Sequence, residues 1–153
     1  MILSPLSLAH GPAIAGILGD EQCLGVPRPG PRESTALWLR RRLDDPFART
    51  FVAATEEQGI FGVTALERIE ALTAELTYWV APGFRGRGLG AAAARATVEI
   101  AFDSLRLRLL DAWVAETNAG SRAILERLEF AHRPATVVSS GGATVLAYRR
   151  LSA

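Results

Sequence analysis

Short hydrophobic segments recur along the chain, either alternating with polar residues or continuous, and glycine, proline and charged residues separate them. Segments of this kind that contain many β-branched and aromatic side chains are typical of strands. The glycine-containing connection at 56–59 makes the second and third segments an antiparallel hairpin. The predicted strands cover residues 2–6, 50–55, 60–66, 72–80, 107–115, 130–138 and 143–150.

Between these strands, apolar residues recur at the spacing of a helix. A first helix begins near Pro12, and Ser34 caps a second that ends near Leu43. The three consecutive arginines at 40–42 in this second helix are interpreted as a solvated face. A third helix runs from Leu89 to about residue 103, and a fourth follows Asn118.

The chain is organised around residues 74–102, where a buried strand, a glycine-rich loop and a helix follow one another. The loop Arg85-Gly86-Arg87-Gly88-Leu89-Gly90 leads directly into the helix. It directs several backbone N–H groups at one point near the positive end of the helix dipole, which suits phosphate or pyrophosphate. The glycines leave room for phosphate oxygens, and the two arginines add fork-shaped donors. We therefore expect a nucleotide-like ligand at this loop.

The glycine spacing also fits a dinucleotide site. Gly86-x-Gly88-x-x-Ala91 matches the dinucleotide-binding fingerprint, and Asp111 lies about where that fingerprint places its ribose-binding acid. In the fingerprint the first glycine turns the chain directly off the strand, whereas here residues 81–85 intervene. This separation weakens the dinucleotide interpretation.

Two motifs resemble those of the GNAT N-acetyltransferase superfamily. The spacing Arg85-x-x-Gly88-x-Gly90 after an aromatic strand resembles its acyl-coenzyme A pyrophosphate loop. The segment Asn118-Ala119-Gly120-Ser121, followed by residues 124–130, is similar to its second signature, in which an asparagine precedes a helix ending in Leu-Gly-Phe. Residues 3–6, Trp38-Leu39 and Ala74-Glu75-x-x-Tyr78-Trp79 look like the RimJ/RimL branch, whose members acetylate protein N-termini or small amines.

Three positions depart from that pattern. Ser4 stands where the branch usually has arginine, and Glu129 stands where it has glycine. Leu125 occupies a position at which many superfamily members carry tyrosine, and leucine cannot donate a proton.

The resemblance implies one α/β (α+β) domain over residues 1–153, with a mixed, mostly antiparallel sheet of about seven strands splayed at its centre and about four helices. It implies an N-acetyltransferase that moves an acetyl group from acetyl-CoA directly to a primary amine, either a protein N-terminal α-amine or a small-molecule amine. The strands at 72–80 and 107–115 would separate at their C-terminal ends and admit the acyl-pantetheine arm. The loop at 19–31 is expected to shape the acceptor pocket together with the closing hairpin.

The resemblance also assigns site residues. Glu75 would be the general base, acting through water, and Ser121 would donate a proton to the departing thiolate. Backbone groups of the strand would bond the pantetheine amides and the oxyanion, and Asn118 would form the other wall or only cap its helix. The expected coenzyme-binding residues are Tyr78, Trp79, Val80, Arg85, Gly86, Arg87, Gly88, Leu89, Gly90, Ala91 and Asn118.

Composition excludes several other classes of protein. All 17 basic residues are arginine and the net charge is +1, which argues against a nucleic-acid binder that works by bulk charge. Cys23 is the one cysteine, so an internal disulfide and a cysteine-based metal cluster are excluded, and no metal is expected. We expect no signal peptide and no membrane helix, hence a cytoplasmic bacterial enzyme that is a monomer or a homodimer.

Two alternatives stay open at this point. The chain could be a GNAT-fold protein that binds acyl-CoA without catalysis, because Leu125 replaces a possible proton donor. Less favoured is a small dinucleotide-binding protein, for the reason given above.

Overall fold

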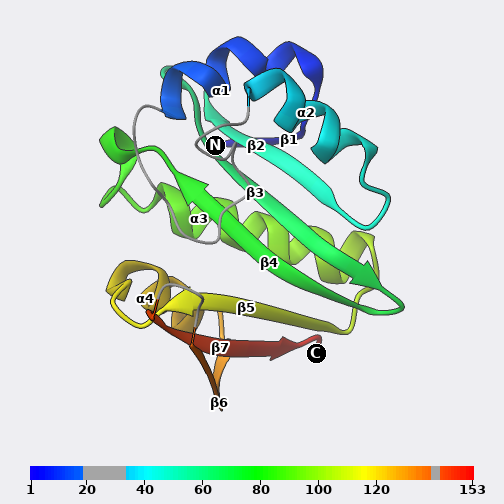
Figure 1. The fold of residues 1–153 in the computed structure, drawn as a ribbon, viewed down its shortest axis with the longest axis vertical. Coiled ribbons are helices and arrows are strands. Elements are labelled where there is room, and N and C mark those ends of the chain that lie inside the picture. The colour runs from blue at the N-terminus through cyan, green and yellow to red at the C-terminus, as the bar shows by residue number, and fades with distance from the viewer. Residues whose placement is uncertain (19–33, 139–141) are drawn as a thin grey trace.

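Seven strands in the described residues, 1–18, 34–138 and 142–153, form one sheet in the order β1-β2-β3-β4-β5-β7-β6 (Figure 1). In this computed structural model every pair of neighbouring strands is antiparallel except β4 and β5, which are parallel. The predicted mixed, mostly antiparallel sheet is therefore confirmed. The strands are β1 (Ile2–Pro5), β2 (Arg49–Thr55), β3 (Gly59–Glu70), β4 (Thr73–Val80), β5 (Leu109–Ala115), β6 (Ala131–Val138) and β7 (Thr144–Leu151).

Four α-helices of the described chain cover the sheet, two on each face. On one face, α1 (Gly11–Leu18) and α2 (Thr35–Asp44) bury Ile14 and Trp38 against β2 and β3. On the other face, α3 (Leu89–Glu99) and α4 (Ala119–Arg127) pack on β4, β5 and β7 around the larger hydrophobic cluster. A π-helical turn, Ile100–Ser104, extends α3 to about the predicted end of the third helix.

Most predicted elements occur in the structure with small shifts at their ends. The Ser34 side chain accepts a hydrogen bond from the Leu37 N–H (3.2 Å), so the predicted cap of α2 is confirmed. Strand β3 is longer than its apolar pattern predicts: it extends to Glu70, and its pairing with β4 is irregular between Glu67 and Glu70. The predicted loop at 19–31 and the tip of the closing hairpin at 139–141 lie outside the described residues.

The arginines of α2 do not form a uniformly solvated face. Arg42 is buried, and its Nη1 lies 2.6 Å from Glu67 Oε1 on β3. Its Nε and Nη2 both donate to Thr50 Oγ1 on β2 (3.1 and 2.9 Å). The prediction is therefore wrong for Arg42, because partners on two strands compensate its desolvation.

Glu129, which stands where the resemblance places a glycine, adopts a left-handed backbone conformation. Its φ is 62° just beyond the end of α4, where a helix commonly ends in a left-handed residue that is most often glycine. The Glu129 carboxylate lies 3.2 Å from Arg150 Nη2 on β7. The chain thus keeps the backbone geometry of a glycine C-cap with a charged residue in its place.

Candidate active site

Strands β4 and β5 pair over three residues and then separate. Residues 73–75 pair with residues 109–111, whereas the remainder of β4 pairs only with β3. Figure 1 shows the two strands diverging toward their C-terminal ends. The predicted central splay is confirmed, and we call the region beyond Glu75 and Asp111 the β4–β5 split.

Tyr78 and Val80 direct their backbone groups at the split. Ala81 donates its N–H to the Phe61 carbonyl of β3 (2.8 Å). Because backbone groups alternate in direction along a strand, Trp79 also directs its N–H and C=O at β3. A side chain at Gly62 of β3 would collide with the Trp79 carbonyl, which agrees with this direction. Of the three predicted pantetheine contacts, Trp79 therefore faces the wrong way, while Tyr78 and Val80 face the split.

The Val80 carbonyl already accepts a hydrogen bond within the chain. Arg85 Nε donates to it at 3.0 Å, after the 3₁₀ turn Pro82–Phe84 has folded the loop back on the end of β4. Arg87 instead donates to Gln58 Oε1 (3.2 Å) and lies 5.8 Å from the centre of the Phe84 ring. The guanidinium groups of both predicted arginines thus have partners within the chain.

Gly86 and Gly88 have the positive φ that the sequence analysis expects at some loop positions. Their φ values are 71° and 76°, and a Cβ at either residue would meet no atom within 4 Å. Gly88 is the N-cap of α3, and its carbonyl accepts from the Ala92 N–H (3.1 Å). The N–H groups of residues 89–91 therefore have no acceptor within the helix. This is the local geometry required for an anion site at the start of α3.

Gly90 has a different role from the other two glycines. It lies inside the first turn of α3, and a Cβ there would lie 3.2 Å from Val80 Cγ2 and 3.5 Å from Ile124 Cδ1. Gly90 thus allows α3 to approach both the end of β4 and α4. Its primary role is packing, in addition to any contact of its N–H with a ligand.

Ser121 is held at all three of its polar atoms. Its N–H donates to Asn118 Oδ1 (3.0 Å), which confirms Asn118 as the N-cap of α4. Its Oγ lies 2.7 Å from the Tyr78 hydroxyl, and its carbonyl oxygen lies 3.2 Å from the same hydroxyl. The structure thereby joins β4 to the helix that follows β5, across the split. Burial raises the pKa of Tyr78 to about 12, and the hydrogen bond with Ser121 opposes this rise.

Glu75 and Ser121 lie on opposite faces of the sheet. Tyr78 is paired with Thr64, whose hydroxyl contacts Thr97 of α3 (2.7 Å), so Tyr78 points toward the α3/α4 face. Glu75 is three residues earlier and therefore points toward the α1/α2 face. Its side chain is 21% exposed, and Oε1 lies 3.1 Å from Nη1 of the exposed Arg68. The predicted base and the predicted acid are thus placed on either side of the split.

Two further residues lie on the Glu75 face of β5. Asp111 is paired with Glu75 in the parallel register. Its carboxylate accepts hydrogen bonds from Nε and Nη2 of Arg149 on β7 (2.6 and 2.8 Å). This use of Asp111 argues against its role as a ribose acid. Trp113 is 45% exposed, although β5 is an interior strand of the sheet. The sequence analysis missed Trp113. The available signal was the alternation along β5, in which Trp113 points to the opposite face of the sheet from the buried Leu110, Ala112 and Val114.

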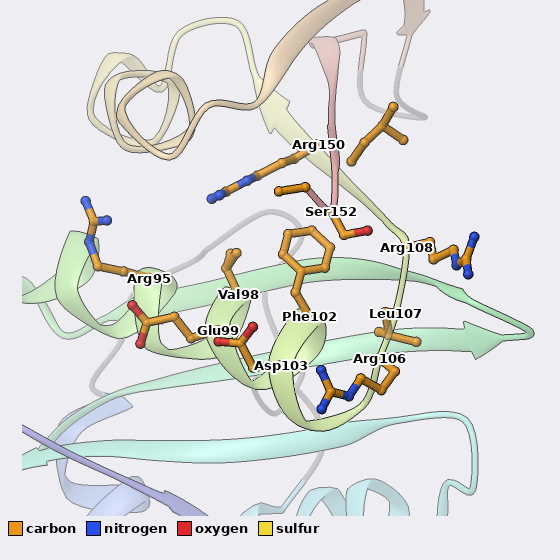
Figure 2. A pocket seen from close by; sticks show the side chains of 12 residues that line it. Arg95, Val98, Glu99, Phe102, Asp103, Arg106, Leu107, Arg108, Arg150 and Ser152 are labelled. Carbon is orange, nitrogen blue, oxygen red and sulfur yellow. The ribbon is translucent and has the colours of Figure 1, made fainter.

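A cavity of about 850 Å³ lies elsewhere in the molecule. Figure 2 shows Phe102 and Arg150 among its walls, between the end of α3 and the end of β7. The predicted site residues take no part in its lining. Among the described residues no group of three His, Cys, Asp or Glu side chains is placed to hold a metal ion. The helices of residues 1–18, 34–138 and 142–153 include none with the length and hydropathy of a membrane span.

A family profile described as an acetyltransferase (GNAT) domain matches residues 1–131. The chain belongs to this GNAT acetyltransferase family. A relative named "Putative ribosomal N-acetyltransferase YdaF", from Bacillus subtilis (strain 168), is 35% identical over 71 residues. That match spans 45% of this chain and 39% of the relative, so the chain corresponds to well under half of that protein's length.

Solved structures of GNAT enzymes share the fold. A variant of the spermidine N-acetyltransferase SpeG from Vibrio cholerae has a TM-score of 0.82 at 19% identity, over 99% of this chain and 95% of that one. The dodecameric spermidine N-acetyltransferase from the same organism, in an intermediate state, has a TM-score of 0.82 at 19% identity, over 98% and 92% of the two chains. These likenesses confirm the predicted GNAT fold. The RimJ/RimL branch stays a prediction.

Proposed function

We propose that this chain moves an acetyl group from acetyl-CoA directly to a primary amine. The observation that carries the proposal is that Glu75 and Ser121 lie on opposite faces of the sheet, on either side of the β4–β5 split. A thioester in the split would then have a base on one side and a hydroxyl donor on the other. Membership of the GNAT family supports acetyl-CoA as the donor.

The coenzyme would bind along the line from the start of α3 into the split. The pyrophosphate would accept from the free N–H groups of residues 89–91 beside Gly86 and Gly88. The pantetheine arm would bond the backbone of Tyr78 and Val80 as an added strand would. For this, Arg85 would have to release the Val80 carbonyl to which it now donates. Asn118, which caps α4, would form the other wall.

The reaction needs a neutral amine, a donor for the oxyanion and help for the leaving sulfur. Amines have pKa values of about 8 to 10.4, so the acceptor is largely charged at neutral pH and must lose a proton. Glu75 would take this proton through water, and the amine nitrogen would attack the thioester carbon. A backbone N–H near Val80 would bond the oxyanion. As the C–S bond breaks, the Ser121 hydroxyl would donate to the sulfur.

The acceptor would approach from the face of Glu75, on which Trp113 is exposed two residues beyond Asp111, the cross-strand partner of Glu75. An exposed aromatic ring on the same face as a carboxylate suits an ammonium group that is about to be deprotonated. We propose a protein N-terminal α-amine or a small-molecule amine. The curated relative is named for ribosomal acetylation and the structural neighbours for spermidine acetylation, so both classes have support.

The coenzyme site is tested by Gly88→Trp, with Gly142→Trp as a matched control. Both glycines have a φ of 76° and open space at Cβ, so the two variants carry the same backbone strain. We expect calorimetry to show loss of CoA binding in Gly88→Trp alone. Unchanged affinity in a folded Gly88→Trp protein would rule out the loop as the pyrophosphate site.

The reaction is tested by acetyl-CoA turnover with N-terminal peptides, polyamines, amino acids and aminoglycosides. We expect turnover with at least one of these acceptors. CoA binding without turnover across the panel would support a binding protein instead, an outcome that the burial of Leu125 in the core keeps open. Binding of NAD without CoA would support the dinucleotide site.

A further inference from the structure

The hydroxyl of Tyr78 is the feature that the proposed reaction leaves unexplained. Tyr78 belongs to β4 and is half-buried against the cluster formed by α3, α4 and β5. Its hydroxyl reaches α4 and lies within hydrogen-bond distance of both Ser121 Oγ (2.7 Å) and the Ser121 carbonyl (3.2 Å). The ring therefore spans the two elements that border the split.

The helix N-cap alone does not orient the Ser121 side chain. Asn118 holds the Ser121 N–H, so it fixes the first turn of α4. The direction of the Ser121 hydroxyl depends on a partner for Oγ, and that partner is Tyr78. A serine hydroxyl has one proton and two lone pairs. The Tyr78 phenol also has only one proton. The 2.7 Å contact with Oγ has the length of an O–H···O hydrogen bond, whereas the Ser121 carbonyl is farther away at 3.2 Å, so we assign the phenol proton to Oγ. The Ser121 proton is then free to point elsewhere.

We propose that Tyr78 is a positioning residue that donates to Ser121 Oγ and thereby directs the Ser121 O–H at the departing sulfur of CoA. The inference rests on the proposed acetyl transfer. Ser121 touches the leaving group, whereas Tyr78 acts only through Ser121. The pair spans 43 residues of sequence, so only the fold brings it together.

The proton balance is consistent with this role. Burial raises the pKa of Tyr78 to about 12, so the phenol stays protonated and gives up no proton during the reaction. When the C–S bond breaks, its electron pair stays on sulfur, and the thiolate accepts a hydrogen bond from Ser121. The amine proton passes to Glu75 and then to water. The thiolate, with a thiol pKa of about 8.5, takes its proton from water.

The test is a double-mutant cycle of Tyr78→Phe and Ser121→Ala in the whole chain, with acetyl-CoA and an accepted amine. We expect each single variant to lower kcat by about tenfold, the scale of one hydrogen bond, and the double variant to lower it no further. The Kd of CoA should be unchanged in both. Tyr148→Phe is the control, because Tyr148 is also buried and its hydroxyl contacts Arg122 and Glu126 of the same helix instead (3.5 and 3.4 Å).

Each outcome decides between the alternatives. Additive losses, or a normal kcat in Tyr78→Phe, would overturn the positioning role while the wild-type turnover keeps the acetyltransferase. A higher Kd for CoA with normal kcat, or an equal effect of Tyr148→Phe, would make Tyr78 a structural contact only. Absence of turnover in the wild-type chain would overturn the proposed function itself, and the positioning role with it.

Discussion

The two faces of β4 carry different chemistry at the split. On the α1/α2 face, the carboxylates of Glu75 and its neighbour Asp111 are paired with arginines. On the α3/α4 face, the polar contacts are hydroxyl pairs, Thr64 with Thr97 and Tyr78 with Ser121, both at 2.7 Å. Ionised groups are costly to bury, so they occupy the face that is partly open to water, and neutral hydroxyls occupy the closed face. Because side chains alternate between the two faces along β4, the same strand presents a carboxylate on one face and a hydroxyl on the other.

The largest expected effect comes from the charged face. Glu75→Gln should lower kcat/KM by roughly 100-fold or more, the range for losing general-base catalysis, because the amide accepts no proton from the acceptor amine. Glu70→Gln is the control, since Glu70 is an exposed glutamate at the end of the neighbouring strand β3. Steady-state kinetics measure both variants. Near-normal turnover in folded Glu75→Gln would leave solvent as the base.

The same face should respond in stability when its buried cation is removed. Arg42→Met should lower the free energy of unfolding by about 2 kcal/mol, because Glu67 loses its partner and Thr50 loses two donors. Chemical denaturation measures the change, with the exposed Arg40→Met as the control. Equal losses in the two variants would mean that the Arg42 network contributes nothing specific.

Trp113 tests whether the acceptor uses the charged face at all. Trp113→Ala should raise the KM of the acceptor amine by about tenfold, the upper scale of a cation–π contact, and leave the KM of acetyl-CoA unchanged. Leu72→Ala is the control, because Leu72 is also 45% exposed but lies at the β3–β4 hairpin. An equal rise in both KM values would remove Trp113 from acceptor binding.

The smallest expected effect is that of the Tyr78 hydroxyl, on the α3/α4 face, on the pH dependence of kcat/KM. Tyr78 must be protonated to donate, and its pKa of about 12 places the loss of that proton far above neutral pH. Between pH 7 and 9, kcat/KM should therefore rise with acceptor deprotonation and show no descending limb from a tyrosine. Comparison of the wild type with Tyr78→Phe measures this. A descending limb that disappears in the variant would contradict the raised pKa.

The fold was predictable because local signals and the global arrangement agree. Period-two segments, the Ser34 cap and the glycine loop each specify an element that the structure contains. The aromatic strand and the glycine loop also predict where a coenzyme would lie, and that location stays a prediction. The sequence could not reveal which backbone groups face the split, because that depends on the β3–β4 pairing. Trp79 was therefore grouped wrongly with Tyr78 and Val80.

Long-range polar pairs were equally invisible. The run of three arginines predicts that Arg42 lies in solvent. Its partner Glu67 is 25 residues away, so the sequence alone does not indicate the ion pair. Ser121 was identified by its motif, but no spacing rule connects it with Tyr78. Side-chain pairing across the sheet is set by register, and a shift of one residue would place each group on the other face.

The glycines of the loop obey two separate substitution rules. At Gly86 and Gly88 the restriction is on the backbone angle, and asparagine, which tolerates positive φ, should be accepted far better than a β-branched residue. At Gly90 the backbone is an ordinary helix and the restriction is volume, so alanine should press on Val80 and Ile124 and larger residues should separate them. A mutant library of this loop therefore needs residues that tolerate positive φ at Gly86 and Gly88, and small residues at Gly90.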